Sequence, residues 1–66
     1  MTIGEKIKDI RIQNGLTQTE FAKKIETTQT SVGLWEKGLC QPSLRALRAI
    51  SIEFKVPIKE LTICLR

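Results

Sequence analysis

Few side chains in this sequence suit general acid–base catalysis or metal binding. The 66 residues include no histidine and no tyrosine, and Asp9 is the one aspartate. Histidine is the commonest proton-transfer group, and two cysteines without histidines do not complete a four-ligand zinc site. Cys40 and Cys64 are also too few for the disulfide framework of a small secreted domain. We therefore expect no enzyme, metal or cofactor, and interpret both cysteines as reduced, small apolar side chains.

A second group of side chains suits contact with an extended polar surface. If residues 28–37 form a helix, Val32 and Trp35 lie roughly 60° apart and define its buried side. The opposite side spans roughly 100° and carries little charge, with these residues: Gln29 at one edge, then Thr30, Gly33, Leu34 and Lys37. A solvated helix face normally carries charged residues. This face is instead short, nearly uncharged and similar in size to what a DNA major groove admits.

Local signals predict that short helices position this face. Thr2 with Glu5, and Thr17 with Glu20, have the spacing of a capping box, in which each side chain hydrogen-bonds the other residue's backbone N–H. Gly15 is placed to end the first helix in a left-handed conformation. Apolar residues at helical spacing give each helix a buried face: Ile3, Ile7 and Ile10 in the first, then Phe21, Ala22 and Ile25 in the second.

The rest of the chain repeats this pattern. Thr28 begins and Gly38 ends a third helix, and Pro42-Ser43 marks the start of a fourth. The fourth carries an apolar stripe: Leu44, Leu47, Ile50 and Phe54. Pro57 ends it and begins a last short turn that contains Ile58 and Leu61. We predict an all-α fold, a compact five-helix bundle in which residues 1–66 form a single domain.

Three segments carry a family resemblance. They are residues 15–18 (Gly-Leu-Thr-Gln) followed by Phe21-Ala22, residues 35–38 (Trp-Glu-Lys-Gly), and residues 42–44 (Pro-Ser-Leu) with Leu47. In this order and at these intervals they resemble the Cro/XRE-type phage-repressor family of helix-turn-helix DNA-binding proteins. The resemblance runs from residue 3 to about residue 61. It implies a lambda-repressor-like domain with its helix-turn-helix core at about residues 17–38.

Glu26 is a departure from the family pattern. It occupies the turn position where this family usually has Gly. If the residue is left-handed, Glu there costs about 1 kcal/mol. We expect the substitution to lower stability or shift the turn slightly without abolishing the motif.

The resemblance implies specific DNA contacts. The third helix would enter the major groove with its N-terminal residues against base edges. The Gln29 amide suits adenine and Leu34 suits a thymine methyl, and Thr30 and Gly33 complete the predicted base-contacting set. Phosphate contacts are implied at helix N-termini and nearby cations: Thr17, Gln18, Thr28, Lys37, Ser43 and Arg45. The other lysines are interpreted as solvated surface.

Arg11 and Glu36 have a structural interpretation. The resemblance suggests that they pair between the first and third helices and fix the angle of the third. The alternative is two independent surface charges. A partly buried, bidentate pair would matter more for geometry than for net stability.

Several apolar residues remain outside the predicted core stripes. They are concentrated in the last third of the chain: Ile52, Ile58, Ile63 and Leu65. Single exposed apolar residues are normal, but an apolar tail after a small domain is less usual. We interpret these residues as the interface of a homodimer, with residues 56–66 as the dimerisation segment.

The net charge of +4 favours a polyanionic partner, either nucleic acid or an anionic membrane surface. The N-terminus has no apolar signal segment and no apolar run approaches a membrane span, so we expect a cytoplasmic protein. The resemblance favours double-stranded DNA and predicts a sequence-specific transcriptional regulator, a repressor or autoregulator that binds a near-palindromic operator as a homodimer. The alternative is a protein-interaction module, such as a DNA-binding antitoxin that neutralises a partner toxin.

Overall fold

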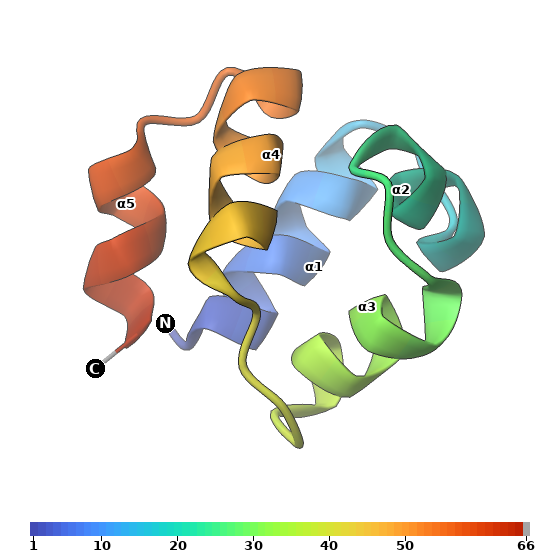
Figure 1. The fold of residues 1–66 in the computed structure, drawn as a ribbon, viewed down its shortest axis with the longest axis horizontal. Coiled ribbons are helices and arrows are strands. Elements are labelled where there is room, and N and C mark those ends of the chain that lie inside the picture. Colours follow the sequence, from blue (N-terminus) through green and yellow to red (C-terminus); the bar gives the residue numbers. More distant parts are fainter. Residues whose placement is uncertain (66) are drawn as a thin grey trace.

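The computed structural model describes residues 1–65 and is all-helical over that range (Figure 1). The helices are α1 (Ile3–Gln13), α2 (Gln18–Lys24), α3 (Gln29–Lys37), α4 (Leu44–Phe54) and α5 (Ile58–Thr62), and a 3-10 turn, η1 (Ile63–Leu65), follows α5. This confirms the predicted five-helix fold. None of the helices in the described residues is long and apolar enough to cross a bilayer. Residue 66, the last of the predicted dimerisation segment, lies outside the described residues.

The helix starts follow the local signals. The Thr2 hydroxyl accepts the Glu5 N–H at 3.1 Å, and the Glu5 carboxylate accepts the Thr2 N–H at 2.8 Å. Thr17 and Glu20 make the same reciprocal pair at the start of α2, at 3.1 and 2.9 Å. Each capping box satisfies backbone donors that the first helical turn leaves without partners. The two boxes therefore define where α1 and α2 begin.

The core joins all five helices. α1 lies between the α2–α3 pair and the α4–α5 pair (Figure 1). Phe21 of α2 stacks on Phe54 at the end of α4, with ring centroids 4.9 Å apart. The buried apolar side chains form one cluster: Ile3, Ile7, Ile10, Phe21, Ala22, Ile25, Val32, Trp35, Leu47, Ile50 and Leu61. Because every helix contributes to this cluster, the position of α3 depends on contacts with the whole bundle.

Gly4 is a close-approach residue that the sequence interpretation missed. It lies in the first turn of α1 and is buried. A Cβ atom built at Gly4 would overlap the carbonyl oxygen of Trp35 and lie 3.3 Å from the Cα of Glu36. The backbones of α1 and α3 can therefore meet here only if residue 4 has no side chain.

Two expectations about apolar residues were wrong. Leu44, predicted to face inward, is 54% exposed, because it occupies the first position of α4, where no neighbouring element covers it. Leu65, predicted to be a spare apolar residue, is half-buried and packs on the core together with Cys64. The η1 turn brings both side chains back onto the bundle. Cys40, in contrast, is exposed, and both cysteines are free thiols.

Candidate nucleic-acid interface

The α2–α3 unit is a compact helix-turn-helix. α2 ends at Lys24, Ile25 caps it, and the chain turns through Glu26 with φ of 59°. The Thr27 N–H then donates to the Ala22 carbonyl at 2.9 Å, and the Thr28 hydroxyl accepts the Ser31 N–H at 3.2 Å to begin α3. Glu26 is thus left-handed, which is the condition under which the sequence predicts a stability cost at this position. A non-glycine residue there carries steric strain.

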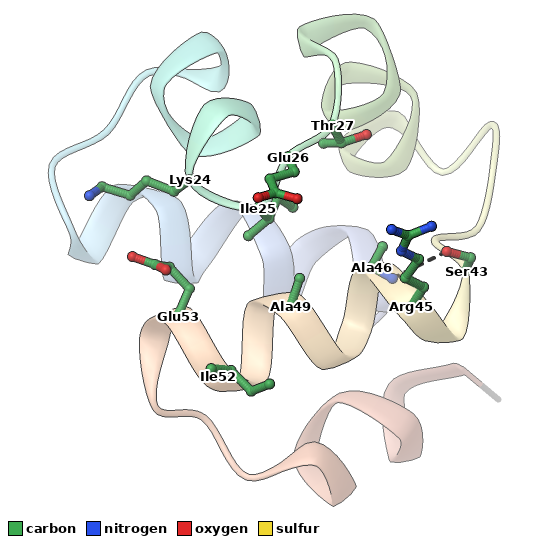
Figure 2. Close-up of a pocket in the computed structure, with 10 residues that line it drawn as sticks. All are labelled: Lys24, Ile25, Glu26, Thr27, Ser43, Arg45, Ala46, Ala49, Ile52 and Glu53. Carbon is green, nitrogen blue, oxygen red and sulfur yellow. Dashed lines mark hydrogen bonds between the residues drawn. The ribbon is translucent and has the colours of Figure 1, made fainter.

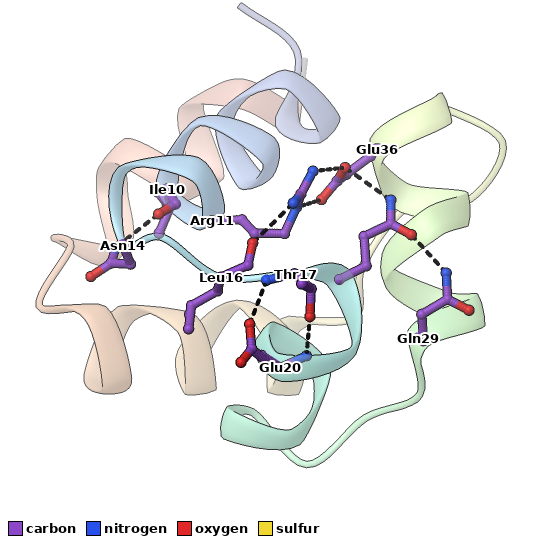
Figure 3. A network of polar contacts seen from close by, with 9 residues as sticks. Ile10, Arg11, Asn14, Leu16, Thr17, Glu20, Gln29 and Glu36 are labelled. Carbon is purple, nitrogen blue, oxygen red and sulfur yellow. Dashed lines mark hydrogen bonds and ion pairs between the residues drawn. The ribbon is translucent and has the colours of Figure 1, made fainter.

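Arg11 and Glu36 pair across α1 and α3, as the resemblance implied (Figure 3). The Arg11 Nε donates to Glu36 Oε2 at 2.7 Å and Nη2 donates to Oε1 at 3.1 Å. The third guanidinium nitrogen, Nη1, donates to the Leu16 carbonyl at 3.0 Å. The two charged side chains are 15% and 5% exposed. The two bonds to Glu36 form a bidentate pair that joins α1 to α3. The third bond joins α1 to the linker before α2.

A chain of amide hydrogen bonds leads from this pair to the surface. The Gln18 Nε2 donates to Glu36 Oε1 at 3.1 Å, and the Gln29 Nε2 donates to Gln18 Oε1 at 2.6 Å. Gln18 is half-buried and Gln29 is exposed. Since each donor fixes the orientation of the next amide, the exposed Gln29 side chain has a defined direction. The sequence interpretation placed Gln18 at a phosphate and did not foresee its link to Gln29.

The predicted base-contacting residues share one face of α3 but differ in exposure. Gln29 and Thr30 are exposed, while Gly33 and Leu34 are half-buried. A Cβ atom at Gly33 would lie 3.5 Å from Gln18 Oε1 and 3.6 Å from Gln29 Nε2, which is ordinary van der Waals distance. The amide pair therefore lies over Gly33. The sequence interpretation had placed Gly33 among the base-contacting residues and did not foresee this amide pair.

The predicted phosphate-contacting residues occupy three helix N-termini and two cationic positions. The hydroxyls of Thr17, Thr28 and Ser43 each accept a backbone N–H as helix caps. Lys37 at the end of α3 and Arg45 in the first turn of α4 are exposed. Helix N-termini attract anions because their N–H groups lack partners within the helix. The arrangement can therefore hold negatively charged oxygens at more than one point.

A hollow of about 470 Å³ separates the helix-turn-helix from α4 (Figure 2). Ile25, Ala46 and Ala49 contribute apolar surface to it, and Ser43 and Arg45 lie at one end (Figure 2). Its charged lining residues carry both signs: Lys24, Glu26, Arg45 and Glu53. No three His, Cys, Asp or Glu residues within residues 1–65 are grouped to hold a metal ion. The hollow is thus a polar cleft beside the predicted phosphate contacts.

The predicted dimer residues lie on α4, α5 and η1. Ile52 is 79% exposed, Ile63 70% and Ile58 39%. These three therefore remain available to a partner surface. Leu65 is available only in part, because it packs on the core.

The two capping-box carboxylates have perturbed acidity. The N–H of Thr2 lowers the pKa of Glu5 below its ordinary value of 4.5, and the Thr2 hydroxyl lowers it further. The backbone N–H and hydroxyl of Thr17 lower the pKa of Glu20 in the same way. Hydrogen bonds to the ionised form favour that form. Both capping-box carboxylates therefore stay ionised to a lower pH than a free glutamate side chain does.

This geometry defines a helix-turn-helix domain, and a comparison with known families agrees. The family described as Helix-turn-helix matches residues 7–61, most of the chain. The chain belongs to this family, in its Cro/C1-type form. The match confirms the resemblance drawn from the three sequence segments.

Two similar proteins contain a related domain. The HTH-type transcriptional activator BcrR of Enterococcus faecalis is 34% identical over 61 residues, which is 92% of this chain and 30% of the relative. An uncharacterized HTH-type transcriptional regulator of Archaeoglobus fulgidus is 36% identical over 58 residues, which is 88% of this chain and 83% of the relative. The chain therefore spans less than a third of BcrR and most of the archaeal protein.

Proposed function

We propose that this chain binds duplex DNA sequence-specifically and regulates transcription. The observation that carries the proposal is the hydrogen-bonded series from the part-buried Arg11–Glu36 pair through Gln18 to the exposed Gln29. An amide held in a defined direction on an exposed helix is suited to a bidentate contact with adenine. The family match and the regulator names of both relatives support the same function.

The base contacts come from one face of α3, within residues 29–34. Gln29 and Thr30 contact base edges, Leu34 contacts a thymine methyl, and Gly33, which has no side chain, lets the α3 backbone lie close to the groove. The phosphate contacts surround them: Thr17, Gln18, Thr28, Lys37, Ser43 and Arg45. Occupancy of a promoter site then blocks competing proteins. This makes the domain a repressor or autoregulator that works in the cytoplasm without a cofactor.

A homodimer completes this proposal. One α3 offers few base contacts, which is too little discrimination to select one site in a genome. Two-fold pairing doubles the contacts and requires a near-palindromic operator with half-sites about 34–36 Å apart. Ile52, Ile58 and Ile63 are the exposed apolar residues for that interface, and Leu65 contributes its remaining exposed edge.

Selection of bound duplexes from a random pool tests the proposal directly. We expect a near-palindromic consensus.

Two variants separate base contacts from phosphate contacts. Gln29→Ala is expected to cost about 1–3 kcal/mol of binding free energy on that consensus and much less on random DNA. Lys37→Ala weakens binding to all duplexes alike and lowers the salt slope by about one phosphate contact. Gln13→Ala is the matched amide control, because Gln13 is exposed on α1 and donates to Asp9. Equal loss of specific and non-specific affinity in both variants would show that the groove assignment is wrong.

Sedimentation tests the homodimer. Ile63→Asp places a charge in the apolar interface and is expected to cost several kcal/mol of association, giving a helical monomer that loses palindrome binding. Ile12→Asp is the control, since Ile12 is 58% exposed on α1, outside the proposed interface. Wild-type protein that sediments as a monomer at micromolar concentration and binds one half-site tightly contradicts the homodimer.

The alternative of a protein-interaction module, such as an antitoxin, has weaker support. An apolar groove would favour it, but the 470 Å³ hollow beside α4 is lined by four charged side chains among its ten residues. A random-pool selection that yields no consensus, together with folded protein, would favour that alternative over operator binding.

A further inference from the structure

The linker between α1 and α2 contains a chemically labile pair of residues, Asn14 and Gly15. Asn14 is the one asparagine in the sequence, and both residues are exposed to solvent. Gly15 has φ of 68° and would meet no heavy atom within 4 Å if it carried a Cβ. Asparagine is among the thermolabile residues of proteins, and a following glycine places no side chain near its amide. No neighbouring side chain therefore hinders the approach of water or of the Gly15 nitrogen to the Asn14 side chain once the backbone is free to rotate.

We propose that Asn14 is a deamidation site that the folded state keeps closed. In this reaction the Gly15 backbone nitrogen forms a bond to Asn14 Cγ, and the bond from Cγ to the amide nitrogen breaks. The Gly15 N–H proton leaves with that nitrogen, so that ammonia is released and a five-membered succinimide remains. One water then opens the ring to aspartate or isoaspartate. Water is the only co-reactant, and no atom is oxidised or reduced.

The folded structure occupies both reacting groups. The Asn14 amide nitrogen Nδ2 donates to the Ile10 carbonyl at 2.7 Å (Figure 3), and the Gly15 N–H donates to the Ile12 carbonyl at 2.9 Å. Asn14, the residue that caps the C-terminal end of α1, also has ψ of 4°. Ring closure requires that both hydrogen bonds break and that the backbone rotates. The reaction can therefore proceed only after this end of α1 opens, either locally or in global unfolding.

The product would weaken the contacts that closed the site. A carboxylate at residue 14 cannot donate to the Ile10 carbonyl, and it adds a negative charge at the C-terminal end of α1, where the helix dipole is already negative. Two residues further on, the Leu16 carbonyl accepts a hydrogen bond from Arg11 Nη1 at 3.0 Å. Deamidation thus loosens the linker that joins the Arg11–Glu36 pair to the start of α2. Each modified molecule opens more readily than the original.

Mass spectrometry tests whether folding slows the reaction at Asn14. Three samples are incubated at the same mildly alkaline pH and at 37 °C. They are the folded protein, the protein unfolded in guanidinium chloride, and a synthetic peptide of residues 8–20. We expect a mass gain of about 1 Da, mapped to Asn14, at similar rates in the peptide and the unfolded protein. The folded protein is expected to react at least tenfold more slowly, since each factor of ten corresponds to about 1.4 kcal/mol of opening free energy. Equal rates in folded and unfolded protein, or no mass gain in the peptide, would overturn the proposal.

Thermal unfolding tests the consequence. Asn14→Asp reproduces one product, and we expect its Tm to fall by about 4–8 °C, because the domain is small and loses about one hydrogen bond's contribution. Gln41→Glu makes the same charge change at an exposed residue of the α3–α4 loop and is expected to change Tm by less than about 3 °C. An Asn14→Asp protein as stable as the wild type contradicts the weakening. Neither measurement uses DNA, so their outcome is independent of the proposed operator binding.

Discussion

The two ends of α3 are held in different ways. At the C-terminal end, Trp35 is 7% exposed, Glu36 accepts two hydrogen bonds from Arg11, and Gly4 lets the α1 backbone approach. At the N-terminal end, Gln29 and Thr30 are exposed, and Gln29 is oriented by an amide hydrogen bond to Gln18. A helix fixed at one end by buried contacts can present polar groups at its other end in a defined direction. Buried contacts thus hold the C-terminal end of α3, while Gln29 and Thr30, two of the proposed base-contacting residues, lie at its exposed N-terminal end.

The largest expected effect comes from breaking the ion pair at the buried end. Glu36→Ala leaves the Arg11 guanidinium, 15% exposed, without its carboxylate partner. We expect a loss of about 3 kcal/mol in the free energy of unfolding, measured by denaturant titration. The control is Glu60→Ala, which removes a pair with Lys6 at 3.5 Å in which the Glu60 side chain is 51% and the Lys6 side chain 22% exposed, and it is expected to cost less than about 1 kcal/mol. Similar losses in the two variants would mean that burial does not distinguish these ion pairs.

A pair of glycine substitutions compares the two ends directly. Gly4→Ala forces the α1 and α3 backbones apart at Trp35, and we expect it to cost about 2–3 kcal/mol. Gly33→Ala meets the Gln18 and Gln29 amides at 3.5 and 3.6 Å, which is tolerated, and it removes the flexibility of a mid-helix glycine. It is expected to stabilise the domain by about 0.5–1 kcal/mol in the same titration. A destabilising Gly33→Ala would indicate that the amide pair needs more space than the structure gives it.

Relief of backbone strain at the turn before α3 has a smaller expected effect. Glu26 has φ of 59°, and Glu26→Gly removes the steric cost of a side chain in that conformation. We expect a gain of about 1 kcal/mol in unfolding free energy. Lys55→Gly is the matched control, because Lys55 has φ of 56° at the end of α4, away from the motif. Similar gains at both positions support the strain interpretation, and a gain at Lys55 alone means that the Glu26 side chain makes a compensating contact.

The smallest expected effect is a pH dependence of the two capping boxes. The pKa values of Glu5 and Glu20 are lower in the folded protein than their ordinary value of 4.5. The ionised carboxylates therefore stabilise the fold above pH 4.5, and this contribution is lost as the pH falls below 4.5 through the lowered pKa values. Thermal unfolding at a series of pH values should show Tm falling in that range. The fall should be shallower in the double variant Glu5→Gln and Glu20→Gln, and an unchanged pH dependence in that variant would assign it to other carboxylates.

Single capping variants sharpen the comparison further, because the two boxes lie beside different ends of α3. The Thr2–Glu5 box is next to Gly4, and the Thr17–Glu20 box is next to Gln18. Thr17→Ala should lower DNA affinity more than Thr2→Ala does, because Thr17 is a proposed phosphate contact as well as the α2 cap beside Gln18, and both variants should cost about 1 kcal/mol in stability. Equal effects on affinity would contradict both the phosphate contact at Thr17 and an orientation of α3 through α2.

Local sequence determined most of the secondary structure. The helix starts at Thr2, Thr17, Thr28 and Ser43 depend on hydrogen bonds between residues three apart. The left-handed residues Gly15 and Gly38 follow from the same short-range geometry. Such signals act within one helical turn, so they can be identified without knowledge of the fold. The Arg11–Glu36 pair was also predicted, but from the family resemblance, since 25 residues separate its members.

Tertiary structure alone decided the features that depend on distant neighbours. Gly4 has the same local sequence signal as any glycine near a helix start, and only the approach of Trp35 makes its missing side chain necessary. Leu44 has the correct helical spacing for the core, but it is exposed. Spacing predicts the direction of a side chain around the helix axis, and it does not predict whether another helix extends far enough to cover that side chain. The Gln18–Gln29 hydrogen bond likewise needs α2 and α3 at their final crossing. Residue types within one turn of each other determine the helices, whereas the packing of helices against one another determines which polar groups remain exposed and in which direction they point.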